Sequence, residues 1–169
     1  MINPYKVGKS IYLRTPIDED INIWHQWFSD EETTKYLAHY YPNTIEKQKI
    51  FLNESKISTS KIVLMICNKS QDNILGVCSL NFINLISKNA EIALVIGDKS
   101  QKNGIVAIES FKLLLEIAFN NLNLENIKSF HNELNDNISI LTKMFGFEEV
   151  GRFKKIAFSD GNFYDDIIT

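Results

Sequence analysis

The sequence is poor in glycine, proline and cysteine, which number seven, three and two in 169 residues. Glycine and proline together reach roughly half of their usual share in proteins, which excludes collagenous, linker-rich and low-complexity chains. The cysteines, Cys67 and Cys78, stand alone within apolar runs. We therefore expect two buried thiols, with neither a disulfide nor a bound metal ion.

An excess of basic residues and a long apolar run are also missing. The formal net charge is −3 and no basic stripe exists, so nucleic acid is not an expected partner. No run approaches the length of a membrane span, and no signal-peptide pattern opens the chain, which predicts a cytoplasmic protein without a membrane partner. The length and a hydrophobic fraction of 44% suit a single domain over residues 1–169.

The apolar residues follow two periods along the chain. Short apolar runs bounded by polar turns predict strands, and apolar residues three and four apart predict helices. The strands are expected at 10–15, 61–67, 74–83, 90–97, 125–134, 147–158 and 162–169. The helices are expected at 18–30, 31–41, 44–55, 105–122 and 135–145. This mixed order, with an antiparallel meander in the middle, predicts an α+β fold.

The most informative segment is the strand at 90–97, the polar loop at 98–104 and the helix that follows. A helix that begins after such a loop offers free backbone N–H groups and a positive dipole end, which together suit a phosphate. Gly104 would let the backbone approach such a group closely. An ordinary strand–loop–helix connection is the alternative. The glycine spacing fits neither a P-loop nor a dinucleotide-binding fingerprint.

The run from Gln101 to Val106 resembles the Q/R-x-x-G-x-G/A acyl-CoA pyrophosphate loop of the GCN5-related N-acetyltransferases (GNAT). Residues 10–21 are similar to the first strand and helix entry of the branch that acetylates ribosomal-protein N-termini and amino sugars. Residues 135–158 resemble the family's N-x-x-S segment and the strand after it, and residues 159–169 resemble its closing hairpin. The order and spacing of these segments make the resemblance specific.

The resemblance implies a mixed, mostly antiparallel, V-shaped sheet of about seven strands flanked by about four helices, with the strands at 90–97 and 125–134 splayed apart. Acetyl-CoA, the implied cosubstrate, would lie in the cleft between them. The residues implied to hold it are Leu94, Val95, Ile96, Gln101, Lys102, Asn103, Gly104, Ile105, Val106 and Asn135. Val106 replaces the family's small residue, and its branched side chain is expected to crowd the loop.

The implied reaction is direct attack of a primary amine on the thioester. Glu91, the only acid in the strand at 90–97, is the candidate base that removes the proton of the amine. Its alternative role is that of an exposed strand residue paired with Lys88 or with a neighbouring strand. The family's hydroxyl positions, which assist the leaving thiolate, fall near Ser139 and Thr142, although both could be ordinary residues of the helix surface. His131 is another candidate acid or base, because the pKa of histidine lies near neutrality, or else a packed core residue.

Aromatic residues gather between residues 24 and 41, the part of this fold that selects the acceptor. The candidate substrate-binding residues are Trp24, Tyr36, His39, Tyr40 and Asp165, because aromatic rings suit sugar faces and an acid suits a cationic amine. The alternatives are that Trp24, at helical spacing with Trp27 and Phe28, is a core residue, and that Asp165 is an ordinary solvated acid. The acceptor implied first is a nucleotide-linked amino sugar. The alternatives are a protein N-terminus, or no acceptor at all in a CoA-binding module that has lost its activity. Relatives of this kind are monomers or homodimers.

Overall fold

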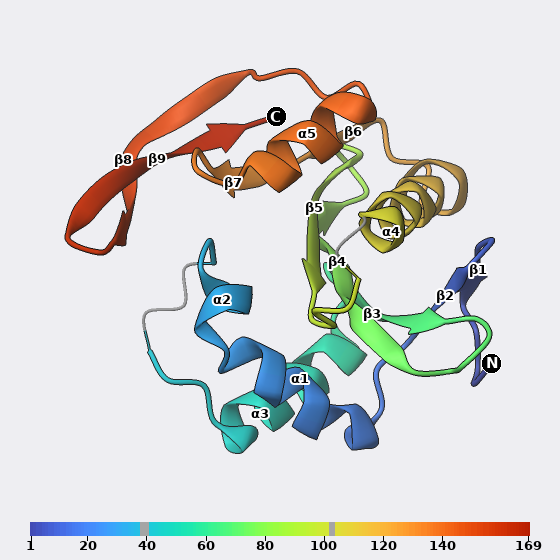
Figure 1. Ribbon diagram of the computed structural model, residues 1–169. Helices are drawn as coiled ribbons and strands as arrows, with labels where there is room; N and C mark the ends of the chain where they lie inside the picture. The colour runs from blue at the N-terminus through green and yellow to red at the C-terminus, as the bar shows by residue number, and fades with distance from the viewer. Residues whose placement is uncertain (38–40, 102–103) are drawn as a thin grey trace.

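The computed structural model describes residues 1–37, 41–101 and 104–169 of the chain (Figure 1). The strands are β1 (Lys6–Val7), β2 (Ile11–Arg14), β3 (Ile62–Asn68), β4 (Ile74–Asn84), β5 (Asn89–Ile96), β6 (Asn126–Lys128), β7 (Phe130–Asn132), β8 (Gly151–Ser159) and β9 (Asn162–Ile168). The helical elements are η1 (Asp18–Asp20), α1 (Ile21–Phe28), α2 (Glu31–Thr34), α3 (Ile45–Ile57), α4 (Ile105–Glu116), η2 (Ile117–Asn121) and α5 (Asp136–Met144).

The strands form two sheets that together make the expected V. One sheet has six strands in the order β1-β2-β3-β4-β5-β6, and the other has three in the order β7-β9-β8. Every strand pair is antiparallel except β5 with β6. Figure 1 shows the smaller sheet leaning away from the larger one beyond the end of β6. The α+β class and the mixed, mostly antiparallel sheet are therefore confirmed.

The sheet divides at a break in what we predicted as one strand. The segment 125–134 forms two short strands, because β6 pairs with β5 and β7 pairs with β9. Ser129 lies between them and exchanges both backbone hydrogen bonds with Thr169, at 2.8 and 3.0 Å. The pairing of β5 with β6 stops at Glu91. Among the described strands, residues 92–96 of β5 therefore have a partner only on the β4 side.

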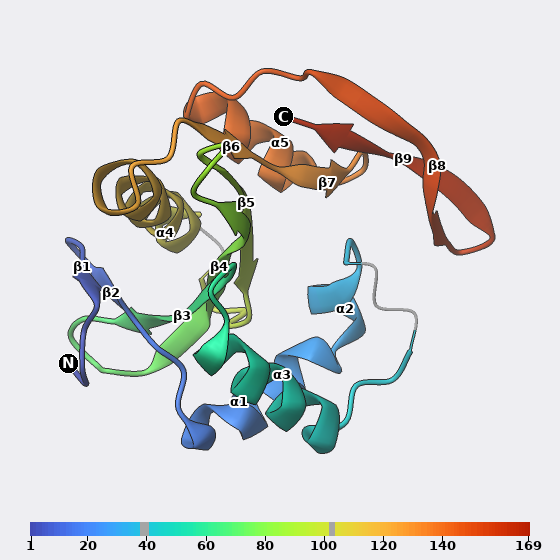
Figure 2. The ribbon, with the colours of Figure 1, turned by 180° about the vertical axis from the view of Figure 1, so that it is seen from behind.

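The six-stranded sheet carries a separate apolar core on each face. One core packs α4, η2 and α5 against the sheet and includes Leu64, Ile92 and Phe111. The other packs α1 and α3 against the opposite face and includes Trp24 and Leu52. Figures 1 and 2 show these helix groups on either side of β5. Each face of β5 therefore looks toward a different set of helices.

The two thiols belong to these cores. Cys67 and Cys78 are buried and unpaired, as predicted, and they belong to opposite cores. Burial raises the pKa of both thiols, so both stay protonated near neutral pH. Within the described ranges, no helix combines the length and the apolar character needed to cross a membrane.

Candidate active site

Two cavities meet at β5. The first, called here the split cavity, has a volume of about 540 Å³ and lies where the two sheets diverge, against Ile96, Gly104 and Asn135. The second, called here the aromatic cavity, has a volume of about 500 Å³ and lies over the opposite face, against Trp24 and Phe51. Both are lined by Leu37, Leu94 and Val95. A molecule in one cavity can therefore meet a molecule in the other at this point of β5.

The start of α4 forms one wall of the split cavity. Gly104 precedes the helix with φ of +71°, a conformation that glycine adopts without strain, and as the N-cap residue it has no side chain to cap the helix. Gln101 and Gly104 both line the cavity, whereas Lys102 and Asn103 lie outside the described residues. The structure thus brings the described part of the predicted phosphate loop to the cavity.

Val106 does not line the split cavity, so its side chain does not crowd that cavity as we expected for the loop. Its side chain is buried in the core beneath α4, because the first helical turn directs it toward the sheet rather than toward the cavity. Ile105, its neighbour, is 55% exposed. Only the backbone of residue 106 is left to face the loop, so a branched side chain there is compatible with an anion at the helix start.

Asn135 forms the facing wall at the start of α5. Its side-chain oxygen accepts a hydrogen bond from the backbone N–H of Ile138 at 3.4 Å, which caps the helix. Asn135 and Ile138 both line the split cavity. The cap fixes the asparagine in place and leaves its amide N–H groups available to the cavity.

Lys99 ties the loop after β5 to α2, whose residues Glu32 and Thr33 line the split cavity. Its ammonium lies 2.9 Å from Oδ1 of Asp30 and 2.8 Å from Oε2 of Glu32. The hydroxyl of Thr33 and this ammonium lower the pKa of Asp30 to about 2, so the pair stays charged at any ordinary pH. Glu32 and Tyr36 line the cavity on the α2 side.

The aromatic cavity is built from α1, α3 and the sheet. The ring of Trp24 meets Phe28 and Phe51 edge to face, with centroids 6.3 and 5.5 Å apart. The indole N–H of Trp24 is buried without a hydrogen-bond partner. Of the predicted substrate-binding residues, the structure places Trp24 in this cavity and Tyr36 in the split cavity. His39 and Tyr40 lie outside the described residues.

Glu91 lies on the face of β5 that looks toward the aromatic cavity. Alternation along the strand puts it on the same face as Ala93, and its neighbour on β4 is Asn81; both of these line the cavity. Burial raises the pKa of the Glu91 carboxyl, while the nearby Lys128 ammonium on β6 opposes the shift. The alternative partner considered from sequence, Lys88, forms its ion pair with Glu125 instead, at 2.7 Å.

The hydroxyl and imidazole candidates do not reach either cavity. Thr142 is fully buried, and its hydroxyl donates to the carbonyl oxygens of Ile138 and Ser139 within the helix. On α5, Ile138 lines the split cavity and Ser139 does not. His131 is 6% exposed, and burial lowers its pKa, so it is a neutral core residue. These placements correct the expectation that one of them faces the cleft.

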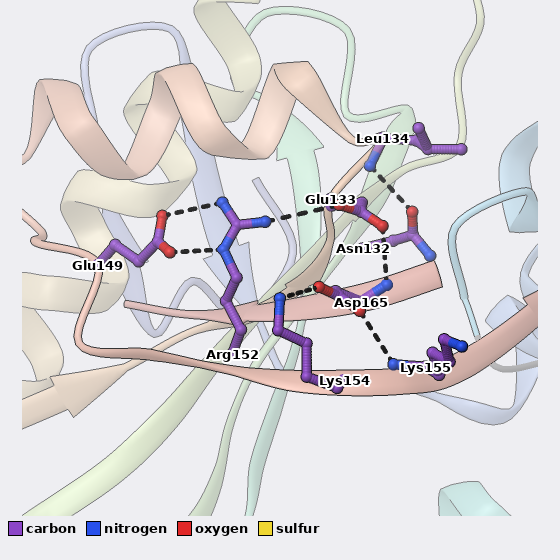
Figure 3. A network of polar contacts seen from close by, with 8 residues as sticks. All are labelled: Asn132, Glu133, Leu134, Glu149, Arg152, Lys154, Lys155 and Asp165. Carbon is purple, nitrogen blue, oxygen red and sulfur yellow. Dashed lines mark hydrogen bonds and ion pairs between the residues drawn. The ribbon is translucent and has the colours of Figure 1, made fainter. Parts of the chain in front are cut away.

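Asp165 is also placed away from the cavities, within a polar network on the small sheet (Figure 3). Its carboxylate binds the ammonium of Lys154 at 2.7 Å and the backbone N–H of Lys155 at 2.9 Å. Its backbone N–H donates to Glu133, which also pairs with Arg152. The carboxylate is therefore engaged in holding the hairpin, which corrects its prediction as an acceptor-binding residue.

Sequence reasoning missed part of the aromatic cavity. Lys47, Gln48 and Lys61 line it, and none was singled out. The buried face of α3 contains Gln48 and Leu52, while Ile50 is 58% exposed. The four-residue spacing between Gln48 and Leu52 was the available signal, but a polar residue does not stand out in a search for an apolar face.

Comparisons with known proteins agree with this geometry. The model of the acetyltransferase (GNAT) domain matches residues 10–148. The chain is 26% identical over 151 residues to an uncharacterised N-acetyltransferase, p20, of Bacillus licheniformis, covering 87% of this chain and 84% of that protein. Its fold is similar to the spermidine N-acetyltransferase of Vibrio cholerae in complex with CoA and spermine, with a TM-score of 0.88, 21% identity, and coverage of 95% and 94% of the two chains.

A second solved structure, a GNAT-family acetyltransferase of Bacillus anthracis, matches with a TM-score of 0.82 at 18% identity and covers 96% of this chain and 95% of its own. These likenesses show the fold, and the match to the domain model covers most of the chain. The chain belongs to the GNAT acetyltransferase family, and the prediction of an acetyl-CoA-dependent N-acetyltransferase is confirmed.

Proposed function

We propose that this protein transfers an acetyl group from acetyl-CoA in the split cavity to a primary amine in the aromatic cavity. The observation that carries the proposal is that the two cavities share Leu37, Leu94 and Val95. Acetyl transfer by direct attack requires that the two substrates reach one point from separate sides. The shared stretch of β5 supplies that point.

The residues of the split cavity fit acetyl-CoA. The unpaired edge of β5, at Leu94, Val95 and Ile96, has backbone groups that suit the amides of a pantetheine arm. The start of α4 behind Gly104 carries the positive end of the helix dipole and suits a pyrophosphate, which would bind the backbone from Gln101 to Val106. A backbone N–H near Val95 or Ile96 would stabilise the negative oxygen of the tetrahedral intermediate.

Glu91 is proposed as the base. An ammonium cannot attack, so the acceptor first gives a proton to the Glu91 carboxylate, directly or through water. The amine nitrogen then bonds to the thioester carbon, the carbon–sulfur bond breaks, and the acetylated nitrogen loses its second proton. The CoA thiolate takes a proton from solvent, since a thiol has a pKa of about 8.5 and no side-chain acid is required.

The acceptor proposed first is an amino sugar, and a nucleotide-linked one in particular. The aromatic cavity offers the rings of Trp24 and Phe51 for a sugar face and the amides of Asn43, Gln48 and Asn81 for hydroxyls. A protein N-terminus is the second candidate, because the amides of Asn43, Gln48 and Asn81 also suit the backbone of a peptide.

A thiol-release assay tests the proposal. The purified protein is mixed with acetyl-CoA and one amine at a time: a nucleotide-linked amino sugar, a peptide with a free N-terminus, and spermidine. We expect steady release of CoA thiol with the amino sugar, at a rate well above the amine-free rate, and an N-acetylated product in the mass spectrum. Turnover with the peptide alone would move the assignment to the second candidate. Tight CoA binding without turnover of any amine would contradict the proposal.

A further inference from the structure

The charged side chains that line the aromatic cavity are of one sign. Lys47 on α3 and Lys61 just before β3 line it, and no carboxylate does so among the described residues. The five residues outside the described part, at 38–40 and 102–103, include no aspartate or glutamate. These five residues therefore add no negative charge to the cavity. Its lining is positive, although the net charge of the protein is negative.

Neither ammonium is neutralised by a carboxylate in the described structure. Lys47 donates to the carbonyl oxygen of Pro42 at 3.1 Å, and the Lys61 ammonium lies 4.6 Å from the ring centre of Phe51. By contrast, Lys56, further along α3, pairs with Asp18 at 2.6 Å. The two cavity lysines thus keep their charge available to a ligand.

Two neutral donors accompany the lysines. Gln48 is only 5% exposed, and its side-chain oxygen accepts from Asn43 at 3.2 Å. Within the described residues its amide N–H groups have no acceptor, and Gln48 lines the cavity. The indole N–H of Trp24 also lacks an acceptor. The donors are thus two ammonium groups, an amide and an indole. Such a set of donors favours a ligand whose acceptor oxygens carry negative charge.

Resting on the proposed function, we infer that the acceptor amine carries an anionic group, a phosphate or a carboxylate, that Lys47 and Lys61 bind. Glu91, on the face of β5 that looks toward this cavity, then takes the ammonium end of the same molecule. A substrate with opposite charges at its two ends is oriented by this arrangement. A polyamine meets two like charges instead, which disfavours it in this cavity.

Matched pairs of amines test the inference by thiol release. Glucosamine 6-phosphate is compared with glucosamine, 4-aminobutyrate with butylamine, and spermidine is assayed alone. We expect at least one anionic amine to exceed its neutral partner by about tenfold or more in kcat/KM, the change expected from one charge-assisted contact. The first pair reports a phosphate site and the second a carboxylate site. Equal values within both pairs, or a preference for spermidine, would overturn the inference.

Variants assign the preference to the two lysines. Lys47→Gln and Lys61→Gln should each remove most of the advantage in kcat/KM that the anionic amine has over its neutral partner. Lys61→Arg, which keeps the charge, should retain the advantage. Lys49→Gln is the control, since Lys49 is exposed on α3 and does not line the aromatic cavity. An undiminished preference in both glutamine variants would reject the assignment.

A binding experiment distinguishes failure of this inference from failure of the proposed function. Trp24 lines the cavity, so quenching of tryptophan fluorescence reports occupancy by glucosamine 6-phosphate or 4-aminobutyrate without any turnover. If no amine releases thiol, the proposed function fails. The anion site is still supported if quenching is saturable and the affinity that it reports falls about tenfold in the Lys47→Gln, Lys61→Gln double variant. Absence of saturable quenching by both anions, together with no difference in turnover, contradicts the site itself.

Discussion

At the scale of single residues, the burial of Glu91 is the feature with the clearest consequence. Its carboxyl pKa is raised by burial, which brings a general base closer to the pH at which the enzyme works. The same burial acts on stability. Because the folded-state pKa is raised, the stability contributed by protonated Glu91 is present at low pH and is lost as the pH rises through that pKa.

Glu91→Gln should therefore separate catalysis from folding. We expect kcat/KM to fall by about a hundredfold or more, the usual contribution of a general base, with the largest loss at low pH where more of the amine is protonated. The melting temperature at neutral pH should equal or exceed that of the unmodified protein, because the neutral amide avoids the cost of a buried charge. The measurements are a pH profile of acetylation and a thermal melt.

The control for this variant is Glu125→Gln, at an exposed glutamate paired with Lys88. It should leave the pH profile unchanged. A Glu91→Gln enzyme with the original pH profile would remove Glu91 from the mechanism.

Gly104 permits a second comparison between matched residues. Gly104 and Gly161 have φ of +71° and +78°, and a Cβ at either would meet no atom within 4 Å. Alanine at either site should cost about 1 kcal/mol of stability, from the left-handed backbone alone. Only Gly104→Ala should weaken CoA binding, measured by calorimetry, because Gly161 lies in the turn between β8 and β9. Equal CoA affinity in the two variants would refute the phosphate assignment.

At the scale of elements, the loop after β5 contacts α2, which lines the split cavity. Lys99 makes this contact with Asp30 and Glu32, all on the surface. Lys99→Ala should raise the KM for acetyl-CoA several-fold while it changes stability by less than about 1 kcal/mol, since exposed ion pairs contribute little to folding. Lys88→Ala, which breaks the pair with Glu125, serves as the control. An unchanged KM in Lys99→Ala would show that this contact does not support the cavity.

The secondary-structure elements also show which features can be predicted from the sequence. The bounds of α4 and of the meander β3–β5 were predicted closely from the spacing of apolar residues, because apolar residues recur at regular intervals along a buried face. The division of 125–134 into β6 and β7 was missed, since Ser129 looks like an ordinary strand residue and its role depends on pairing with the distant Thr169. The half-buried position of Ser139 and the buried position of Thr142 also depend on the rotation of α5 about its axis, which no local sequence pattern determines.

At the scale of the whole molecule, the sequence motifs predicted the V-shaped sheet, and of the residues predicted to hold the cofactor Leu94, Val95, Ile96, Gln101, Gly104 and Asn135 line one cavity. The acceptor side was predicted only in part. Trp24 lines the aromatic cavity but is also buried in the core beneath it, and Asp165 is engaged in the hairpin network. Lys47 and Lys61 come from separate elements that only the fold brings together. Residues that form a pocket from distant segments carry no spacing signal, which explains why the charge of the aromatic cavity emerged only from the structure.

The central claim is that the two substrates meet on β5 where the cavities join. A crystal structure of the protein with bound CoA tests it most directly. The account predicts that the pyrophosphate lies at the start of α4 beside Gly104, and that the sulfur lies beside Leu94 and Val95, facing the aromatic cavity. A CoA sulfur that lies away from these two residues, or a pyrophosphate bound elsewhere, would contradict it.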